Sequence, residues 1–138
     1  MTTVAEVMTH EVVCINMDTP LGAAMDVCAD KRIRHLPVLD DQKTLAGLVT
    51  DRDLRYFISP RIGTLSENNS DRGSLRRPVH LIMAREIVAT SPEASLSEAA
   101  QAMLTNRVGC LPALDPERHV IGIITTTDLI RYIAQERA

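Results

Sequence analysis

Two threonine–aspartate pairs in this chain have the spacing and the chemistry to bind the sugar of a nucleotide. Thr50 and Asp53 stand where a β-branched run passes into a helical pattern, and Thr125 and Asp128 stand at a second such point. Unpaired backbone N–H groups and the helix dipole favour an anion at a helix start. An aspartate one turn into the helix can accept hydrogen bonds from both hydroxyls of a ribose, each worth about 1.5–3 kcal/mol.

The same pairs also fit a purely structural role. Thr-x-x-Asp at a helix start is close to a capping box, in which the threonine side chain binds a backbone N–H and the acid satisfies the first turn. The residues alone leave both interpretations open. A micromolar ligand requires about 8 kcal/mol in total. Ribose contacts would therefore need help from apolar enclosure of a base and from pairing of a phosphate.

An internal repeat positions the two pairs. A shift of 75 residues aligns Val4–Ile58 with Val79–Ile133 without a gap, and roughly 16 of the 55 paired positions are identical. Each copy has the pattern β-α-β-β-α. Two copies are too few for a solenoid. We therefore expect an α+β fold in which two similar halves bury their apolar faces on each other as a pseudo-two-fold pair.

Local signals predict the elements of each copy. The first copy has a strand at Val12–Ile15, a helix with Thr19 as N-cap and Pro20 at its first position, the strands LPVL and LAGLVT, and a helix at Asp51–Ile58. The second has a strand at Ile87–Ala89, a capping box from Ser95 to Glu98, the strands LPAL and VIGIIT, and a helix from Thr126 to about Gln135. Polar loops, Asp40–Thr44 and Asp115–His119, join the strand pairs.

The repeat also predicts the domain boundaries. Residues 1–58 form a first domain with a short N-terminal helix, and residues 79–138 form a second. Residues 59–78 are polar, contain two glycines and have no sustained period, which is typical of a linker that can be partly ordered over the surface. The linker arginines could contact a phosphate or an acidic partner, or simply be solvated; they are Arg61, Arg72, Arg76 and Arg77.

Composition and motifs exclude several functional classes. A net charge of -3 argues against nucleic-acid binding. No apolar run approaches the roughly 18 residues that span a bilayer, and the N-terminus lacks a signal-peptide pattern. Three cysteines without a CxxC pair fit small hydrophobes in a reducing compartment, so we expect a cytoplasmic protein without membrane insertion. No nucleophile–base pair, Walker-type loop or metal-ligand spacing stands out, so we expect no catalytic residue, no metal site and surface histidines at His10, His80 and His119.

Four segments of the repeat resemble the hallmarks of the CBS domain. They are RIRHLPVLD and GLVTDRDL in the first copy, at Arg32–Asp40 and Gly47–Leu54, and RVGCLPALD and GIITTTDL in the second, at Arg107–Asp115 and Gly122–Leu129. The resemblance covers nearly the whole chain outside the linker and identifies a tandem pair, or Bateman module. CBS pairs pack their sheets together with two clefts at the interface, and two pairs often form a disc-like dimer.

The resemblance implies a function. In the family the clefts bind AMP, ADP, ATP, S-adenosylmethionine or related adenosyl ligands, and binding changes the activity of an attached or associated protein. We therefore expect a homodimeric sensor that is not an enzyme, needs no obligatory cofactor and regulates a separate, unidentified protein. A ligand-independent, dimerising adaptor for a protein partner is the alternative.

The resemblance also assigns the site residues. Ribose would bind at Thr50, Asp53, Thr125 and Asp128. Adenine would lie against Val13 and Ile33 in the first copy and Val88 and Val108 in the second, positions that equally fit an ordinary core. The phosphate-binding residues of the first copy would be Arg34, His35 and Arg52. Because the second copy has Gly109, Cys110 and Thr127 there, we expect two unequal clefts, with phosphate handled mainly by the first copy.

Overall fold

Each compact unit combines the first segment of one repeat with the remainder of the other repeat. The computed structural model describes residues 1–136, apart from the side chains of Ser70 and Glu136. One compact unit, the middle unit, is Val13–Ile87. The other, the terminal unit, combines Met1–Val12 with the chain from Val88 onwards. The compact units therefore begin and end at other residues than the repeats do.

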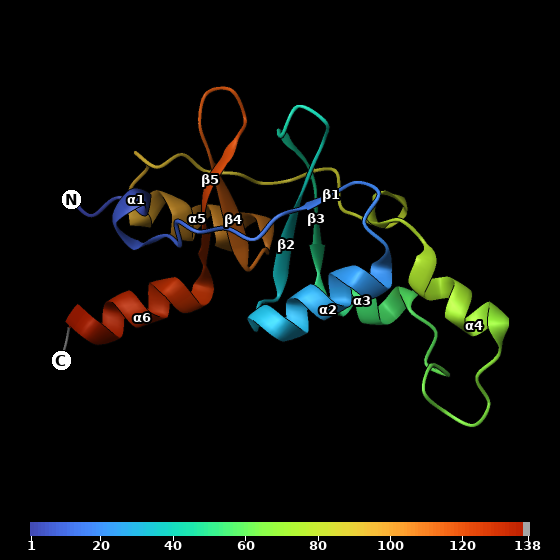
Figure 1. Cartoon of the computed structure of the whole chain (residues 1–138). Coiled ribbons are helices and arrows are strands. Elements are labelled where there is room, and N and C mark those ends of the chain that lie inside the picture. The colour runs from blue at the N-terminus through green and yellow to red at the C-terminus, as the bar shows by residue number, and fades with distance from the viewer. Residues whose placement is uncertain (137–138) are drawn as a thin grey trace. The chain divides into compact units, whose positions relative to one another are not determined.

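The middle unit is built on a three-stranded sheet of order β1-β2-β3 (Figure 1). The strands are β1 (Ile15–Asn16), β2 (His35–Leu39) and β3 (Leu45–Thr50). β1 runs parallel to β2, and β2 runs antiparallel to β3, with His35 opposite Thr50. The helices α2 (Leu21–Lys31) and α3 (Asp51–Phe57) pack against each other. The predicted order of elements in the first copy is confirmed.

The start of α2 differs from the prediction. Its N-cap is Pro20, which makes no side-chain capping hydrogen bond, and not Thr19. The Thr19 hydroxyl accepts instead from the backbone N–H of Asn16 at 3.2 Å. This bond closes the turn between β1 and α2, so the hydroxyl serves the turn and not the helix. The strand itself begins at Ile15, later than the predicted Val12.

The terminal unit contains an antiparallel hairpin of β4 (Cys110–Leu114) and β5 (Val120–Thr125). Its helices are α1 (Val4–Val7), α5 (Leu96–Asn106) and α6 (Thr126–Glu136). The predicted capping box is confirmed, because Ser95 Oγ accepts from the Glu98 N–H at 3.0 Å. The predicted strand Ile87–Ala89 is wrong: the chain makes a single parallel bridge from Thr90 to Ala113. A β-branched run forms a strand only where a partner lies in register over several residues.

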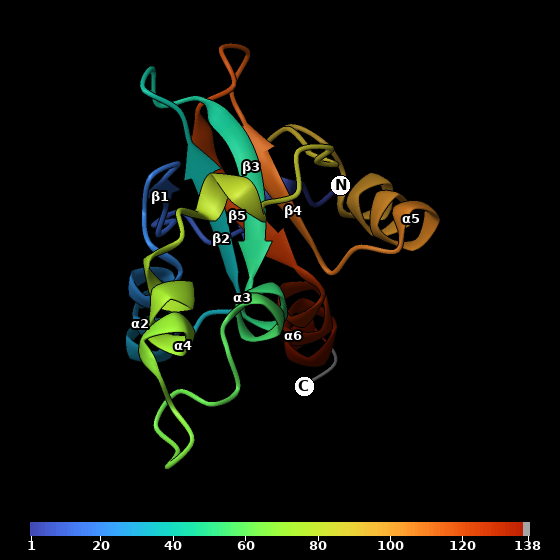
Figure 2. The same cartoon turned by 90° about the vertical axis from the view of Figure 1, so that its right-hand side faces the viewer.

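Residues 59–78 are more structured than a plain linker. They contain α4 (Asn69–Gly73) and a 3₁₀ turn, η1 (Ser74–Arg76), and are followed by η2 (Val79–Leu81). η1 packs against α2, where a Cβ on Gly22 would lie 3.2 Å from Leu75 Cβ. Figure 2 shows the segment, in green to yellow, returning past α2. Arg72 forms an ion pair with Glu67 at 3.1 Å, inside the same segment.

Each unit has its own apolar core. Val79 of the second repeat is fully buried in the core of the middle unit, and Val4 of the first repeat is fully buried in that of the terminal unit. The two valines are equivalent in the repeat and are held alike: the Val79 N–H donates to Thr19 O at 2.9 Å, and the Val4 N–H to Ala94 O at 2.8 Å. The exchange of first segments is thus fixed by backbone bonds as well as by packing.

The three cysteines are free and at least partly buried. Cys28 and Cys110 are buried and Cys14 is half-buried, all three as thiols. Burial raises the pKa of each, that of Cys110 to about 12. This environment fits the predicted role of small hydrophobes.

Among residues 1–136, no helix combines the length and the apolar character that crossing a membrane requires.

Candidate ligand-binding site

The junction between β3 and α3 carries the first threonine–aspartate pair. Thr50 is the N-cap of α3, and its Oγ1 accepts from the Asp53 N–H at 3.1 Å. Asp53 Oδ2 accepts from the Thr50 N–H at 3.1 Å. The pair therefore forms a complete capping box, and the structural interpretation of these residues is correct.

The junction between β5 and α6 repeats this arrangement. Thr125 Oγ1 accepts from the Asp128 N–H at 3.2 Å, and Asp128 Oδ2 accepts from the Thr125 N–H at 2.9 Å. The Thr125 hydroxyl also lies 3.1 Å from Asp128 Oδ2 and donates to it. Both repeats thus fix the aspartate side chain in one orientation at the end of a strand.

The cap uses only one oxygen of each aspartate. Within residues 1–136, the structure shows no hydrogen-bond partner for Oδ1 of Asp53. Oδ1 of Asp128 accepts from Arg131 Nη1 at 3.3 Å. A carboxylate has two oxygens and about four lone-pair sites. Capping and ligand binding are therefore compatible, because the cap holds Oδ2 and orients Oδ1.

Basic residues flank the junction of the middle unit along the chain. His35 is half-buried and pairs with Thr50 across the sheet, and the Arg34 carbonyl accepts from the Asp51 N–H at 3.0 Å. Burial lowers the pKa of His35, the Asp51 charge opposes this shift, Arg34 lowers the pKa further and Asp53 raises it. His35 therefore lies within electrostatic reach of both carboxylates. The exposed Arg52 lies in the first turn of α3.

The junction of the terminal unit has different surroundings. Cys110 pairs with Thr125 across the hairpin, and the Gly109 carbonyl accepts from the Thr126 N–H at 3.1 Å. These positions correspond to His35 and Arg34, so the predicted difference in charge between the copies is present in the fold. Arg131, which sequence reasoning missed, supplies a cation at this junction. Its spacing of three residues from Asp128 on a predicted helix could have identified it.

The four aliphatic site candidates line the edges of the cores. Val13 and Ile33 pack against the buried core of the middle unit, and Val88 and Val108 pack against that of the terminal unit. All four are half-buried. They therefore serve as core residues and still present part of their surface, which adenine contact also requires.

An open cleft of about 650 Å³ lies elsewhere in the middle unit. It is lined by α2, the end of α3 and the 59–78 segment, including Met25, Arg55, Ile58 and Leu75. Neither Thr50 nor Asp53 lines it. This cleft is separate from the residues that the repeat singles out.

Comparison with sequence relatives covers nearly the whole chain. The family model described as CBS domain matches residues 4–60 and 79–135. A CBS domain-containing protein of Dictyostelium discoideum is 36% identical over 129 residues, which are 92% of this chain and 88% of that protein. The homoserine O-acetyltransferase of Methanohalobium evestigatum is 30% identical over 97% of this chain, but the chain spans only 24% of that enzyme.

Solved structures show the same fold. The CBS domain pair of protein MJ0100, in complex with 5′-methylthioadenosine and S-adenosyl-L-methionine, has a TM-score of 0.83 at 19% identity and covers 99% of this chain and 98% of its own. CBSX2 in complex with AMP has a TM-score of 0.82 at 24% identity and covers 100% of both chains. The two matched regions coincide with the repeats, and each contains one Thr-x-x-Asp junction. This chain belongs to the CBS domain family and carries two tandem CBS domains.

Proposed function

We propose that this chain is a sensor module that binds an adenosine-containing ligand, AMP, ADP, ATP or S-adenosylmethionine, and modulates a separate protein. One observation carries the proposal. At both junctions the capping box fixes the aspartate through Oδ2 and leaves Oδ1 outside the cap. A pre-oriented carboxylate beside a helix start can accept hydrogen bonds from the ribose hydroxyls. It does so without the loss of rotamer entropy that an unrestrained side chain would undergo.

The two junctions are proposed to differ in ligand preference. Arg34, His35 and Arg52 would complement a phosphate at the middle unit. At the terminal unit a ribose that binds Asp128 competes for Oδ1 with Arg131, whose side chain is 61% exposed. Because the Asp128 side chain is only 10% exposed, this ion pair is stronger than a fully exposed one, and competition with it weakens ligand binding. We therefore propose a phosphorylated nucleotide for the middle unit and a weaker or less charged adenosyl ligand for the terminal unit.

Two observations on other proteins support the class of ligand. The MJ0100 pair holds 5′-methylthioadenosine and S-adenosyl-L-methionine, and CBSX2 holds AMP. Both share the fold of this chain at identities below that at which ligand choice carries over. They support an adenosyl group, and the phosphate preference rests on the residues of this chain.

A thermal-shift panel tests the proposal. AMP, ADP, ATP and S-adenosylmethionine are compared with GMP and inosine at the same concentrations. At 100 times its dissociation constant a ligand stabilises the folded state by about 2.7 kcal/mol, so at least one adenosyl compound should raise Tm by several degrees. No response to any of them at millimolar concentration would defeat the proposal.

The second candidate is a ligand-independent adaptor. The complete capping boxes favour it, because they explain both threonine–aspartate pairs without a ligand. Under either function we propose a cytoplasmic homodimer. Apolar side chains that a dimer could cover are exposed on α6, at Ile130 (66%) and Ile133 (53%), and on α3, at Tyr56 (81%). A dimer by light scattering, no ligand response and a co-purifying partner would together select the adaptor.

A further inference from the structure

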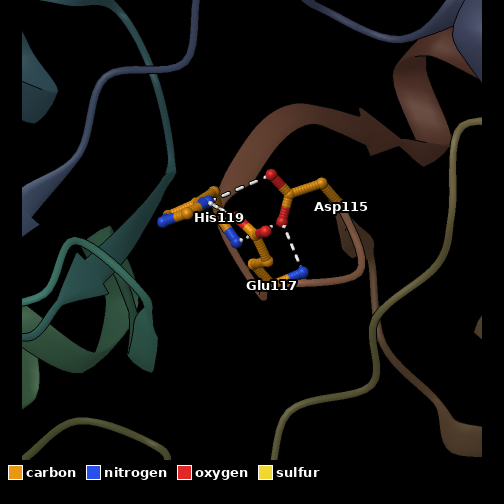
Figure 3. Close-up of side chains that lie close together, drawn as sticks. All are labelled: Asp115, Glu117 and His119. Atoms are coloured by element: carbon orange, nitrogen blue, oxygen red, sulfur yellow. Dashed lines mark hydrogen bonds and ion pairs between the residues drawn. The ribbon is translucent and has the colours of Figure 1, made fainter.

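The loop between β4 and β5 gathers two carboxylates and an imidazole. His119 Nδ1 lies 3.0 Å from Asp115 Oδ2 and 3.6 Å from Glu117 Oε2 (Figure 3). One ligand atom from each of the three side chains lies within 4.8 Å of the other two. All three residues come from one short turn of the terminal unit. The predicted surface histidine His119 thus has two acidic neighbours.

The backbone of the loop explains how alternate residues come together. Asp115 Oδ1 accepts from the N–H groups of Glu117 and His119, each at 2.9 Å. Arg118 adopts a left-handed conformation with φ of 68°. The turn is therefore held by Oδ1 of Asp115, and Oδ2 is directed toward the imidazole.

The equivalent loop of the first repeat folds without these ligands. Asp40 Oδ1 accepts from the N–H groups of Gln42 at 2.9 Å and Thr44 at 3.0 Å, and Lys43 has φ of 66°. There the Thr44 hydroxyl donates to Asp40 Oδ2 in the place of the His119 ring. Glu117 and His119 are consequently not required for the turn. Their presence adds metal-binding groups to a scaffold that is already stable.

Two of the three separations are close to those between ligands of a small divalent ion. Zn²⁺ binds imidazole nitrogen and carboxylate oxygen at about 2.0–2.2 Å, which places neighbouring ligands of a tetrahedral site about 3.4 Å apart. The distances from His119 Nδ1 to Asp115 Oδ2 and to Glu117 Oε2, 3.0 Å and 3.6 Å, fall on either side of this value. Mg²⁺ prefers an octahedron of oxygens, whereas an imidazole with two carboxylates suits the zinc class of ions.

We propose that Asp115, Glu117 and His119 form a binding site for a divalent transition-metal ion of the zinc class. The ion takes the place of the proton between His119 Nδ1 and Asp115 Oδ2, and that proton moves to Nε2 or to solvent. Three protein ligands leave a fourth position for water or a further donor. The site lies at the opposite end of β5 from Thr125, about 20 Å along the strand, so it does not depend on the proposed adenosyl site.

Calorimetric titration of the full chain with zinc chloride tests the site. The wild type should bind one ion per chain. His119→Thr restores the residue of the first repeat together with its hydrogen bond to the aspartate, and should abolish binding while the chain stays folded. Glu117→Gln, again the residue of the first repeat, should weaken binding about tenfold or more. Glu93→Gln, an exposed carboxylate elsewhere in the same unit, should leave it unchanged.

Transfer of the triad to the first-repeat loop gives a test that predicts a gain of binding, which a loss of folding stability could not produce. Gln42→Glu combined with Thr44→His writes the triad onto the first-repeat loop and should raise the stoichiometry to two ions per chain. In the wild type, zinc should also shift the ¹⁵N resonance of His119 Nδ1. The proposal is overturned by no zinc binding up to about 100 μM, by wild-type binding in folded His119→Thr, or by a transplant that still binds one ion.

Discussion

Arg131 Nη1 donates to Asp128 Oδ1 across 3.3 Å, whereas the equivalent position beside Asp53 is occupied by Tyr56. The two junctions share the capping box and differ in what meets the second carboxylate oxygen. Asp128 is 8% exposed and Asp53 is half-buried. The duplicated scaffold thus presents the same acid to two different electrostatic surroundings.

Replacement of Arg131 should strengthen the binding of an uncharged ligand at Asp128. Arg131→Tyr introduces the residue of the first repeat and removes an ion pair whose carboxylate is buried, so adenosine should bind at least about fivefold more tightly at this junction. Calorimetry with adenosine measures the change. Arg76→Gln removes the same charge from the middle unit and serves as the control. Weaker binding by Arg131→Tyr would mean that the guanidinium itself contacts the ligand.

The preference for AMP over adenosine should disappear when the junction of the middle unit is given the equivalent residues of the terminal unit. The variant Arg34→Gly, His35→Cys, Arg52→Thr removes the cationic and imidazole groups and leaves Thr50 and Asp53 in place. Charged hydrogen bonds are worth about 1.5–3 kcal/mol, so the ratio of AMP to adenosine affinity should fall by about tenfold or more. Arg55→Ile, a change to the residue of the second repeat, is the matched control. An unchanged ratio would place the phosphate contacts elsewhere.

Methionine contacts should make two glycines sensitive to any added side chain. A Cβ on Gly122 would collide with Sδ of Met8, and one on Gly47 would collide with Sδ of Met83. Because both methionines are buried, Gly122→Ala and Gly47→Ala should each destabilise the fold by about 1–3 kcal/mol. Gly73→Ala, with no atom within 4 Å of its Cβ, is the control. Urea unfolding measures all three, and equal stabilities would contradict the close contacts.

The thiol of Cys110 should make the free energy of unfolding fall as the pH rises into the alkaline range. Burial raises its pKa from 9.0 to about 12. Its contribution to stability is therefore complete below pH 9, where the unfolded thiol is neutral, and is lost as pH rises from about 9 toward 12. Near pH 10.5, Cys110→Ala should reduce the downward slope of unfolding free energy by about 1.4 kcal/mol per pH unit relative to wild type. Parallel slopes would show that Cys110 is not buried as a neutral thiol.

Local sequence signals predicted the elements that depend on neighbouring residues. The capping box at Ser95 and the helix starts at Thr50 and Thr125 follow from side chains that bond within one turn, and the structure confirms them. Thr19 had the same residue type but bonds back to Asn16, because a hydroxyl at a strand end can serve either the turn or the helix.

Relationships between distant segments could not be predicted in the same way. Val4 and Val79 are equivalent in sequence, and nothing in their own segments shows that each packs with the other repeat. The approach of His119 to Asp115 depends on the left-handed turn at Arg118, which the spacing of the residues does not indicate. Arg131 was overlooked because the first repeat has no basic residue at that position.

We propose that the aspartates of the two capping boxes bind ribose through Oδ1, the carboxylate oxygen that makes no capping hydrogen bond. Calorimetric titration of AMP into wild type, Asp53→Asn and Asp128→Asn tests it most directly, because an asparagine oxygen can still accept the capping N–H and keep the helix start. We expect Asp53→Asn to keep the wild-type Tm and to lose AMP affinity by about tenfold or more. Wild-type affinity and stoichiometry in both folded variants would contradict it.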